Sequence, residues 1–187
     1  LAAAIELARN GRSVVVYETA DAVGGGSRSA ELTLPGFVHD VCSAIHPLAA
    51  ASPFFRQLPL GSHGLEWIHP SAPLAHPLDD GTAVVVERSV DATADGLGDD
   101  AGAYRRLMGP IVRDWDKIQA ATTRPIARIP RHPIALARFG LLALLPARLV
   151  ARRAFRGERA RAVFAGLAAH SFLPLDAPLS TTFALML

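Results

Sequence analysis

The chain has 187 residues, of which 50% are hydrophobic and 19% charged, a composition that excludes a disordered protein and fits a globular one. Its single cysteine, Cys42, excludes a disulfide framework within the chain and fits a reducing compartment, so we expect a cytoplasmic protein. The net charge of +2 is uneven, because the segment Arg124–Arg161 holds ten arginines and one acidic residue, a local charge of +9 that indicates an anionic partner.

The beginning of the chain alternates helix and strand signals, as an α/β protein does. Residues 1–9 carry apolar side chains at helical spacing, and Gly11 is a typical helix stop. The β-branched run Ser13–Tyr17 predicts a short, buried strand of the parallel type, which ends at the carboxylate of Glu18. A glycine-rich loop, Ala22–Ser29, follows this strand.

Strand signals continue after this loop. The stretch ELTLPGFVHD, residues 31–40, contains a Pro-Gly turn signal and predicts a β-hairpin. Residues 65–69 and 82–87 are two further strand candidates, separated by proline-rich loops. Because the composition shifts near residue 90, we expect a partial α/β domain over 1–90 and a helical region over 91–187.

Helical periodicity dominates the second half of the chain. The predicted segments are a short helix over 89–98, a long helix over 99–122 with Asp99 or Asp100 as its N-cap, an apolar and arginine-rich region over 132–155 broken by Pro146, and two helices over 157–169 and 178–187. Both ends of the sequence fall inside predicted elements, so we expect an internal piece of a longer chain.

A carboxylate at a strand end, with a glycine triplet soon after it, points to a nucleotide. In a βαβ nucleotide-binding unit the diphosphate sits at the helix N-terminus, and an acid about 20 residues past the glycine fingerprint binds a ribose hydroxyl. Residues 1–18 match the second half of such a unit, with Glu18 as the acid, and we expect the fingerprint to precede Leu1. The triplet Gly24–Gly26 lets backbone approach a ligand, and Arg28 can neutralise a diphosphate. The alternatives are a solvated strand end and an ordinary turn, but the combination favours dinucleotide binding.

The stretch VVVYETADAVGGGSRS, residues 14–29, resembles the flavin-containing amine oxidase and phytoene desaturase superfamily, in which a strand ending in Glu is followed by Gly-Gly and Arg. AELTLPGFVHDVCSAIHPL, residues 30–48, is similar to the stretch of the phytoene desaturase-like branch where a Gly-Phe hairpin leads to an Asp and a small-residue turn beside the flavin. DDAGAYRRLMGPIV, residues 99–112, resembles a helical segment of that branch's substrate domain. The resemblance covers residues 1–120 well and the rest loosely.

This resemblance implies FAD as the cofactor, with Glu18 on the adenosine ribose and the loop residues along the diphosphate and the flavin. The implied cofactor-binding residues are Glu18, Gly24, Gly25, Gly26, Ser27, Arg28, Asp40 and Ser43. Two features depart from the family pattern. Gly26 and Ser27 stand between the Gly-Gly pair and Arg28, and Val41–Ser43 occupy the place of the Gly-Pro that follows Asp in many carotenoid desaturases. The resemblance therefore supports FAD more strongly than a carotenoid substrate.

The fold implied by the resemblance is a Rossmann-like, FAD-binding α/β domain that lacks its first strand and glycine fingerprint, with a β-rich insertion and a helical substrate domain. The implied activity is an FAD-dependent oxidoreductase that dehydrogenates or desaturates a small apolar molecule by hydride transfer to the flavin. No catalytic residue is assigned. An amine oxidase or a flavin-dependent isomerase on the same fold remains open, as does a non-catalytic, membrane-associated FAD-binding protein.

A dense polar cluster follows the hairpin, at His39, Asp40, Cys42, Ser43 and His46. Histidine and cysteine are metal ligands, and a Cys–His pair can act as a nucleophile. The spacing matches no standard zinc pattern, and the chain has a single cysteine. We therefore expect no metal, and a turn that packs against the flavin.

The basic segment Arg124–Arg161 mixes arginine with Leu, Phe and Ala, as in a basic amphipathic helix that lies on an anionic membrane surface. A solvated arginine face over an ordinary core helix is the other interpretation of this segment, and it is the favoured one. Nucleic acid is disfavoured, because aromatic residues interleave with the arginines only at Phe139 and Phe155.

Overall fold

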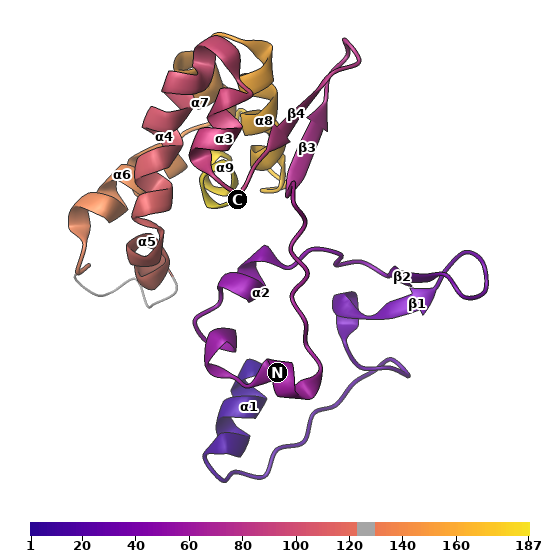
Figure 1. The fold of residues 1–187 in the computed structure, drawn as a ribbon. Coiled ribbons are helices and arrows are strands. Elements are labelled where there is room, and N and C mark those ends of the chain that lie inside the picture. The colour runs from indigo at the N-terminus through magenta and orange to yellow at the C-terminus, as the bar shows by residue number, and fades with distance from the viewer. Residues whose placement is uncertain (123–129) are drawn as a thin grey trace. The chain divides into compact units, whose positions relative to one another are not determined.

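The structure, a computed structural model, describes residues 1–122 and 130–187, and the chain forms two compact units (Figure 1). Unit 1 is Leu1–Ile68 and unit 2 is His69–Leu187. The composition shift near residue 90 lies inside unit 2, because the strands just before it pack on helices that follow.

Unit 1 combines short helices with one β-hairpin. Its elements are α1 (Ala2–Arg9), η1 (Gly25–Ser27), β1 (Ser29–Glu31), β2 (Val38–Asp40), α2 (Pro47–Ala51), η2 (Phe55–Gln57) and η3 (Leu60–His63). The helix predicted at the start of the chain is confirmed. Gly11, with φ +71°, follows it in the left-handed conformation that glycine adopts without strain.

The predicted hairpin around Pro35 and Gly36 is also confirmed, since β1 and β2 pair antiparallel. The amide of Phe37 donates to the carbonyl oxygen of Leu34 (3.1 Å), which closes the turn. Gly36 has φ +84°, a turn position that favours glycine. The Pro-Gly pair therefore determines where the chain reverses.

The buried parallel strand predicted over Ser13–Tyr17 is not formed. These residues run without a strand partner, and Tyr17 is 93% exposed. A parallel strand needs neighbouring strands for its backbone groups and helices over its two faces. All of residues 1–68 are described, and the sheet within them pairs β1 with β2 alone. The parallel sheet of a Rossmann-like domain is therefore not assembled within unit 1, and the strand predicted over 65–69 is likewise absent.

No residue of unit 1 is buried. Many of its larger apolar side chains, including those of Val15, Phe37 and Trp67, are exposed, and others, such as Phe54 and Phe55, are half-buried. Burial of apolar surface is the main favourable term in folding. Unit 1 is therefore held by turns and local hydrogen bonds rather than by a core of its own.

Unit 2 is helical and carries one β-hairpin. Its elements are β3 (Leu74–Pro77), β4 (Ala83–Val86), α3 (Val90–Asp95), η4 (Gly98–Asp100), α4 (Ala101–Arg113), α5 (Trp115–Thr122), α6 (Pro133–Ala143), α7 (Ala147–Ala154), α8 (Glu158–Ala169) and α9 (Thr181–Met186). The helices predicted over 89–98, 157–169 and 178–187 are confirmed, as is the break at Pro146 between α6 and α7. β4 confirms the strand predicted over 82–87.

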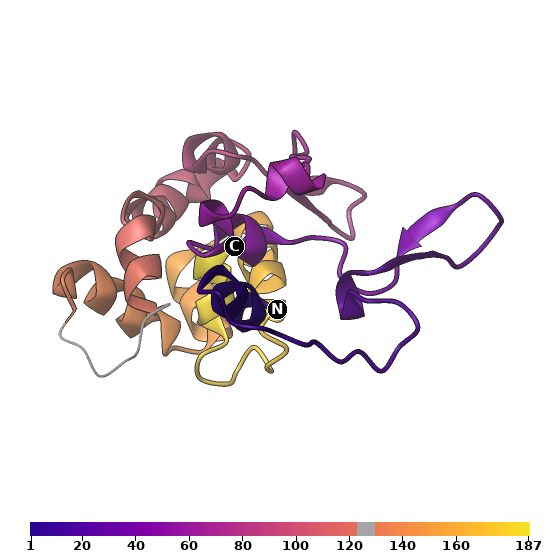
Figure 2. The ribbon, with the colours of Figure 1, turned by 90° about the horizontal axis from the view of Figure 1, so that it is seen from below.

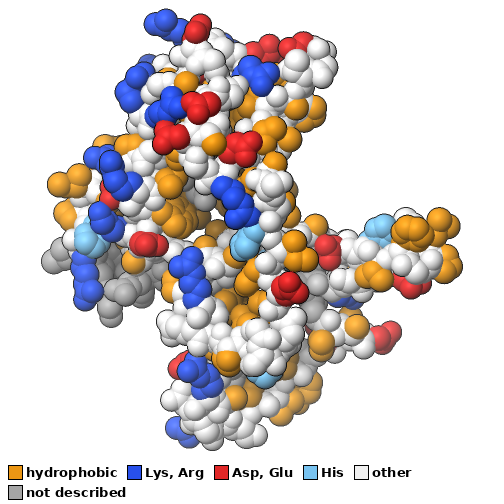
Figure 3. All heavy atoms as spheres, viewed as in Figure 1, with side chains coloured by type: hydrophobic (Ala, Val, Ile, Leu, Met, Phe, Trp, Pro, Cys, Tyr) orange, Lys and Arg blue, Asp and Glu red, His pale blue; other side chains and the backbone are white. Residues whose placement is uncertain are grey.

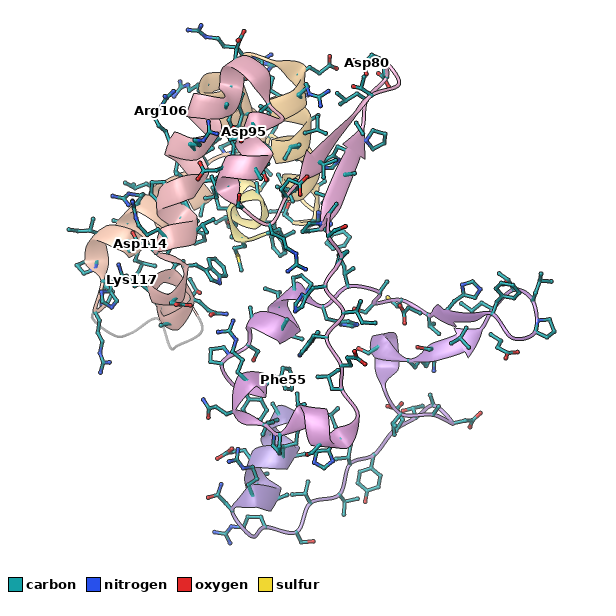
Figure 4. The ribbon with its side chains drawn as sticks, viewed as in Figure 1. Phe55, Asp80, Asp95, Arg106, Asp114 and Lys117 are labelled. Carbon is teal, nitrogen blue, oxygen red and sulfur yellow. The ribbon has the colours of Figure 1, made fainter. Side chains whose placement is uncertain are left out.

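The long helix predicted over 99–122 is two helices, α4 and α5, divided at Asp114 (Figure 4). Pro110 lies inside α4 and has no amide to donate, which weakens the turn that leads to the break. The carboxylate of Asp114 accepts a hydrogen bond from the ammonium group of Lys117 (2.6 Å). Because it precedes the first turn of α5, its negative charge also complements the amides at that N-terminus.

The β3–β4 hairpin packs on α8, and its tip carries Asp80 (Figure 4). Val84 and Val86 of β4 are buried in the core that the hairpin shares with the helices. Arg159 of α8 fastens the hairpin, because its guanidinium donates to the carbonyl oxygen of Ala83 (2.8 Å). The hairpin therefore belongs to the helical unit by both packing and hydrogen bonding.

Three aromatic rings form a row through the core of unit 2. The ring centroids of Tyr104 and Phe155 are 6.4 Å apart, and those of Phe155 and Phe164 are 5.8 Å apart. These distances lie in the range where tilted aromatic pairs attract. The row joins α4 to α8 through Phe155, which follows the last turn of α7.

Asp100 is 3% exposed and connects two distant parts of unit 2. Its carboxylate accepts hydrogen bonds from the backbone amides of Arg156 (2.9 Å) and Gly157 (2.6 Å), where α8 begins. The sequence predicts Asp99 or Asp100 as the cap of the helix that follows directly, and Asp100 does occupy the N-cap position of α4. Asp100 makes no side-chain capping bond to α4 and binds the amides before α8, because the fold brings them to its carboxylate.

α8 and β3 meet at Gly166 and His76. A Cβ atom built on Gly166 would overlap the imidazole ring of His76. The Nε2 atom of that ring is buried and has no hydrogen-bond partner in the part of the chain that the structure describes. The packing of the hairpin on α8 therefore requires a residue without a side chain at position 166.

α6 lies at the rim of unit 2 in both ribbon views (Figure 1 and Figure 2). Within residues 1–122 and 130–187, no single helix is both long enough and apolar enough to span a membrane. α6 and α7 meet that criterion only as a joined pair, which is bent by 102°.

Replacing Asp100 by Ala should destabilise the protein by about 2–4 kcal/mol, because the amides of Arg156 and Gly157 lose their acceptor. Asp99→Ala is the matched control at an exposed neighbour, and its effect should stay within about 0.5 kcal/mol. Urea denaturation followed by far-UV circular dichroism measures both variants. If Asp100→Ala unfolded with the same urea midpoint as the wild type, the proposed role of the carboxylate would be contradicted.

Gly166→Ala should destabilise the protein by about 1–3 kcal/mol, because the new methyl group overpacks the contact with His76. Gly140→Ala is the control, since Gly140 also lies inside a helix and a Cβ there meets nothing within 4 Å. It should be neutral or stabilise by up to about 1 kcal/mol through helix propensity. The same denaturation experiment compares the two, and equal effects would show that the imidazole does not occupy this space.

Lowering the pH should destabilise the protein through His76. Burial lowers the pKa of its imidazole, and the charge of His170 lowers this pKa further. The unfolded chain therefore takes up a proton at a higher pH than the folded one, so this contribution to stability is fully present above about pH 6.5 and is lost as the pH falls. Between about pH 7.5 and about pH 5.5, His76→Gln should lose less stability than the wild type in urea denaturation. His69→Gln, at an exposed histidine, should keep the wild-type pH dependence.

Candidate dinucleotide-binding loop

The glycine triplet forms an open turn on the surface of unit 1. Gly24 has φ +118° and Gly25 has φ +54°, both in the region that side chains disfavour. The amide of Ser27 donates to the carbonyl oxygen of Gly24 (3.0 Å), which closes a single 3-10 turn. A Cβ on Gly25 would meet nothing within 4 Å. Backbone conformation, rather than a close neighbour, therefore explains the glycine at position 25, and the space beside it is free.

The structure brings this turn together with the residues that follow the hairpin. The amide of Ser43 donates to the carbonyl oxygen of Gly26 (2.8 Å), and the amide of Val41 donates to that of Arg28 (3.0 Å). These bonds continue the pairing of β1 with β2 beyond the end of the ladder. Of the predicted cofactor residues, the group from Gly24 to Arg28 therefore lies beside Ser43.

Asp40 joins the same group through the hairpin. Its Oδ1 atom accepts a hydrogen bond from the hydroxyl of Ser29 (3.2 Å), the residue opposite it in the register. The side-chain oxygen of Ser43 lies 3.5 Å from Nδ1 of His46, at the limit of hydrogen bonding. Asp40 and Ser43 thus lie on one edge of the loop.

Donor groups on this loop are free. Within the described residues, the amides of Gly25 and Gly26 donate no hydrogen bond, and the guanidinium of Arg28 forms neither a hydrogen bond nor an ion pair. Two neighbouring amides and a guanidinium are the groups that bind phosphate oxygens in proteins. The loop therefore fits the diphosphate of a dinucleotide, and all of it is open to solvent.

Glu18 stands apart from the loop. Its Oε1 atom accepts a hydrogen bond from the amide of Ala20 (2.9 Å), which forms a local turn after the unpaired segment Ser13–Tyr17. No hydrogen bond joins Glu18 to Gly24–Arg28 in unit 1, all of which is described. The second oxygen of the carboxylate can accept from a ribose hydroxyl, but the strand that would aim it is not assembled.

The polar cluster around the hairpin forms local contacts. His39 Nε2 lies 2.8 Å from the hydroxyl of Thr33, and Cys42 is exposed. In the described parts of the chain, no three His, Cys, Asp or Glu residues lie close enough together to hold a metal ion.

Unit 2 contains a cleft of about 370 Å³ that the sequence does not reveal. Its walls combine apolar side chains, among them Tyr104, Trp115 and Leu185, with charged ones of both signs. The charged residues are Glu87, Arg88, Arg113 and Asp116. Burial raises the pKa of the Tyr104 phenol, and a hydrogen bond with Thr93 opposes this shift. The hydroxyl is therefore protonated at neutral pH. The walls come from segments that lie far apart in the chain, so no local motif marks the cleft.

The comparison with protein families concerns unit 1. Residues 1–58 match the sequence model of the NAD(P)-binding Rossmann-like domain. This segment contains every residue of the predicted cofactor site, from Glu18 to Ser43. No match is found among curated proteins or among solved structures. The family match supports a dinucleotide-binding unit at the beginning of the chain, as the Glu18, glycine and Arg28 pattern predicts.

Proposed function

We propose that this chain is part of an FAD-dependent oxidoreductase that dehydrogenates a small apolar molecule. The observation that carries the proposal is the loop Gly24–Arg28, with its free amides and free guanidinium, inside a segment that matches a dinucleotide-binding family. FAD is preferred to a nicotinamide cofactor because the sequence around this loop resembles flavin oxidoreductases of the phytoene desaturase-like type.

Each loop group has a part in this proposal. The amides of Gly25 and Gly26 donate to diphosphate oxygens, and Arg28 adds a charge-assisted, bidentate pair. Glu18 accepts from a ribose hydroxyl of the adenosine half. Asp40 and Ser43 form the edge of the site on the flavin side. FAD, when bound, supplies the hydride acceptor, and the chain supplies binding and orientation.

We place the substrate on unit 2. Its cleft of about 370 Å³ is lined mainly by apolar side chains, which suit a hydrocarbon portion of the substrate. Arg113 makes no hydrogen bond or ion pair within the described residues, so it can receive a polar or anionic end. The residues that line the cleft include no obvious pair of side chains for proton transfer. Hydride transfer to a flavin does not require such a pair.

Titration of the natural full-length protein with FAD, followed by flavin fluorescence, tests the cofactor. Arg28→Ala should weaken FAD binding roughly 10- to 100-fold, which is the value of one charge-assisted contact. Arg12→Ala is the matched control, because Arg12 is an exposed arginine of unit 1 outside the loop. It should leave the affinity unchanged.

Parallel titrations separate the cofactor from the reaction. If NADH or NADPH bound more tightly than FAD, a nicotinamide would be the cofactor instead of the flavin. If the protein bound none of the three, the oxidoreductase assignment would be removed. Anaerobic addition of apolar alkenes or amines to the FAD-loaded protein should then bleach the visible flavin absorption. Tight FAD binding without bleaching by either class would favour a non-catalytic flavoprotein.

A further inference from the structure

α6 is apolar on both sides. Its inward face consists of Ala135, Phe139 and Ala143, which are buried in the core of unit 2. Its outward face carries large apolar side chains as well, and Ile134 is 75% exposed and Leu141 70% exposed. A helix on the surface of a globular protein normally presents polar residues to water.

The outward apolar residues form a continuous stripe. They are Ile134, Ala137, Leu141 and Leu144. Their spacing of three and four residues places them along one side of the helix, one turn after another. The stripe lies on a helix at the rim of unit 2 (Figure 1 and Figure 2). A contiguous exposed apolar surface of this kind is typical of a site that binds another protein or a membrane.

The surroundings of the stripe are basic. Residues 130–157 hold six arginines and no acidic residue. Arg138 borders the stripe on α6 itself, and Figure 3 shows hydrophobic and basic side chains side by side over the region of α6. Arg152 and Arg153 are exposed on α7, which follows directly. The occupant of this face must therefore tolerate both apolar contact and concentrated positive charge.

These charges are only partly compensated within the chain. Arg138 lies 3.4 Å from Asp114, a carboxylate that already binds Lys117. Arg131 and Arg152, like Arg153, form no ion pair with any other described residue. A contact with ordinary mixed-charge protein surface would leave several of these guanidinium groups without partners. A surface dense in phosphate groups over a hydrocarbon layer satisfies both the stripe and the charges.

We propose that α6 docks unit 2 on the surface of an anionic lipid bilayer. The stripe from Ile134 to Leu144 enters the boundary between head groups and acyl chains, and Arg131 and Arg138 contact lipid phosphates. Long arginine side chains can extend along the helix to reach the head groups while the stripe is immersed. α6 lies in the plane of the membrane, and the 102° bend turns α7 away from that line.

The sequence indicates membrane contact as one interpretation of the whole basic segment Arg124–Arg161. We assign this contact to one helix of the segment, α6. The beginning of that segment, residues 124–129, lies outside the described residues. The proposal does not depend on the cofactor, because lipid binding is measured without FAD. Failure of flavin binding and failure of membrane docking are therefore separate results.

Vesicle flotation of the natural full-length protein tests the proposal. The protein should float with phosphatidylcholine vesicles that contain about 30% phosphatidylglycerol, and much less with phosphatidylcholine alone. Leu141→Asp should reduce the bound fraction about tenfold or more, because it places a carboxylate in the stripe. Arg138→Glu should weaken binding to the anionic vesicles selectively. Raising the salt from about 0.1 M to about 0.5 M should also weaken binding in the wild type.

Phe37→Asp provides the matched control, because Phe37 is an exposed apolar residue on the β1–β2 hairpin of unit 1. It should float like the wild type. Thermal unfolding of each variant checks that the fold is intact, as expected for exposed positions. Absence of flotation, or flotation that Leu141→Asp leaves unchanged, overturns the proposal. A dimer in sedimentation velocity that Leu141→Asp dissociates, without lipid binding, would assign the stripe to a second copy of the chain and also overturn it.

Discussion

The carboxylate of Asp100 accepts backbone hydrogen bonds from residues 56 and 57 positions further along the chain. A buried carboxylate is costly unless its oxygens are hydrogen-bonded, and amides before the first turn of a helix are costly unless they find an acceptor. One contact removes both costs and fixes the start of α4 against the start of α8. The row Tyr104, Phe155 and Phe164 then packs between these helices. The cleft of unit 2, whose walls include Tyr104, depends on this alignment.

The candidate cofactor loop depends on constraints of another kind. No residue of unit 1 is buried, so Gly24–Arg28 is held by backbone bonds to residues 41–43 rather than by packing. The glycine turn and the hairpin could be predicted because their signals are local: positive φ at glycine and a Pro-Gly reversal. The placement of Glu18 could not, because a parallel strand forms only beside neighbouring strands, which lie outside any local pattern. A ligand bound to a loop of this kind also stabilises the folded form of the unit that carries it.

Unit 2 shows the same division between local and distant information. Most of its helices follow from apolar periodicity, but β3 escaped prediction because the run around His76 has no β-branched residues. The break at Asp114 was missed because the apolar residues continue at helical spacing from Ile111 in α4 to Trp115 and Ile118 in α5. Apart from Arg138, the residues of α6 are apolar around the whole helix. The sequence therefore does not say whether Phe139 or Leu141 points inward. Only the position of neighbouring helices decides that Leu141 meets the solvent.

The contact between Gly166 and His76 also limits how the chain can vary. The imidazole fills the volume that a side chain at position 166 would need, so the two positions share one space. A larger residue on α8 must displace the imidazole, and a smaller residue on β3 would remove this conflict. We therefore expect the effects of substitutions at the two positions to be coupled, so that a smaller residue at position 76 makes a side chain at position 166 less costly.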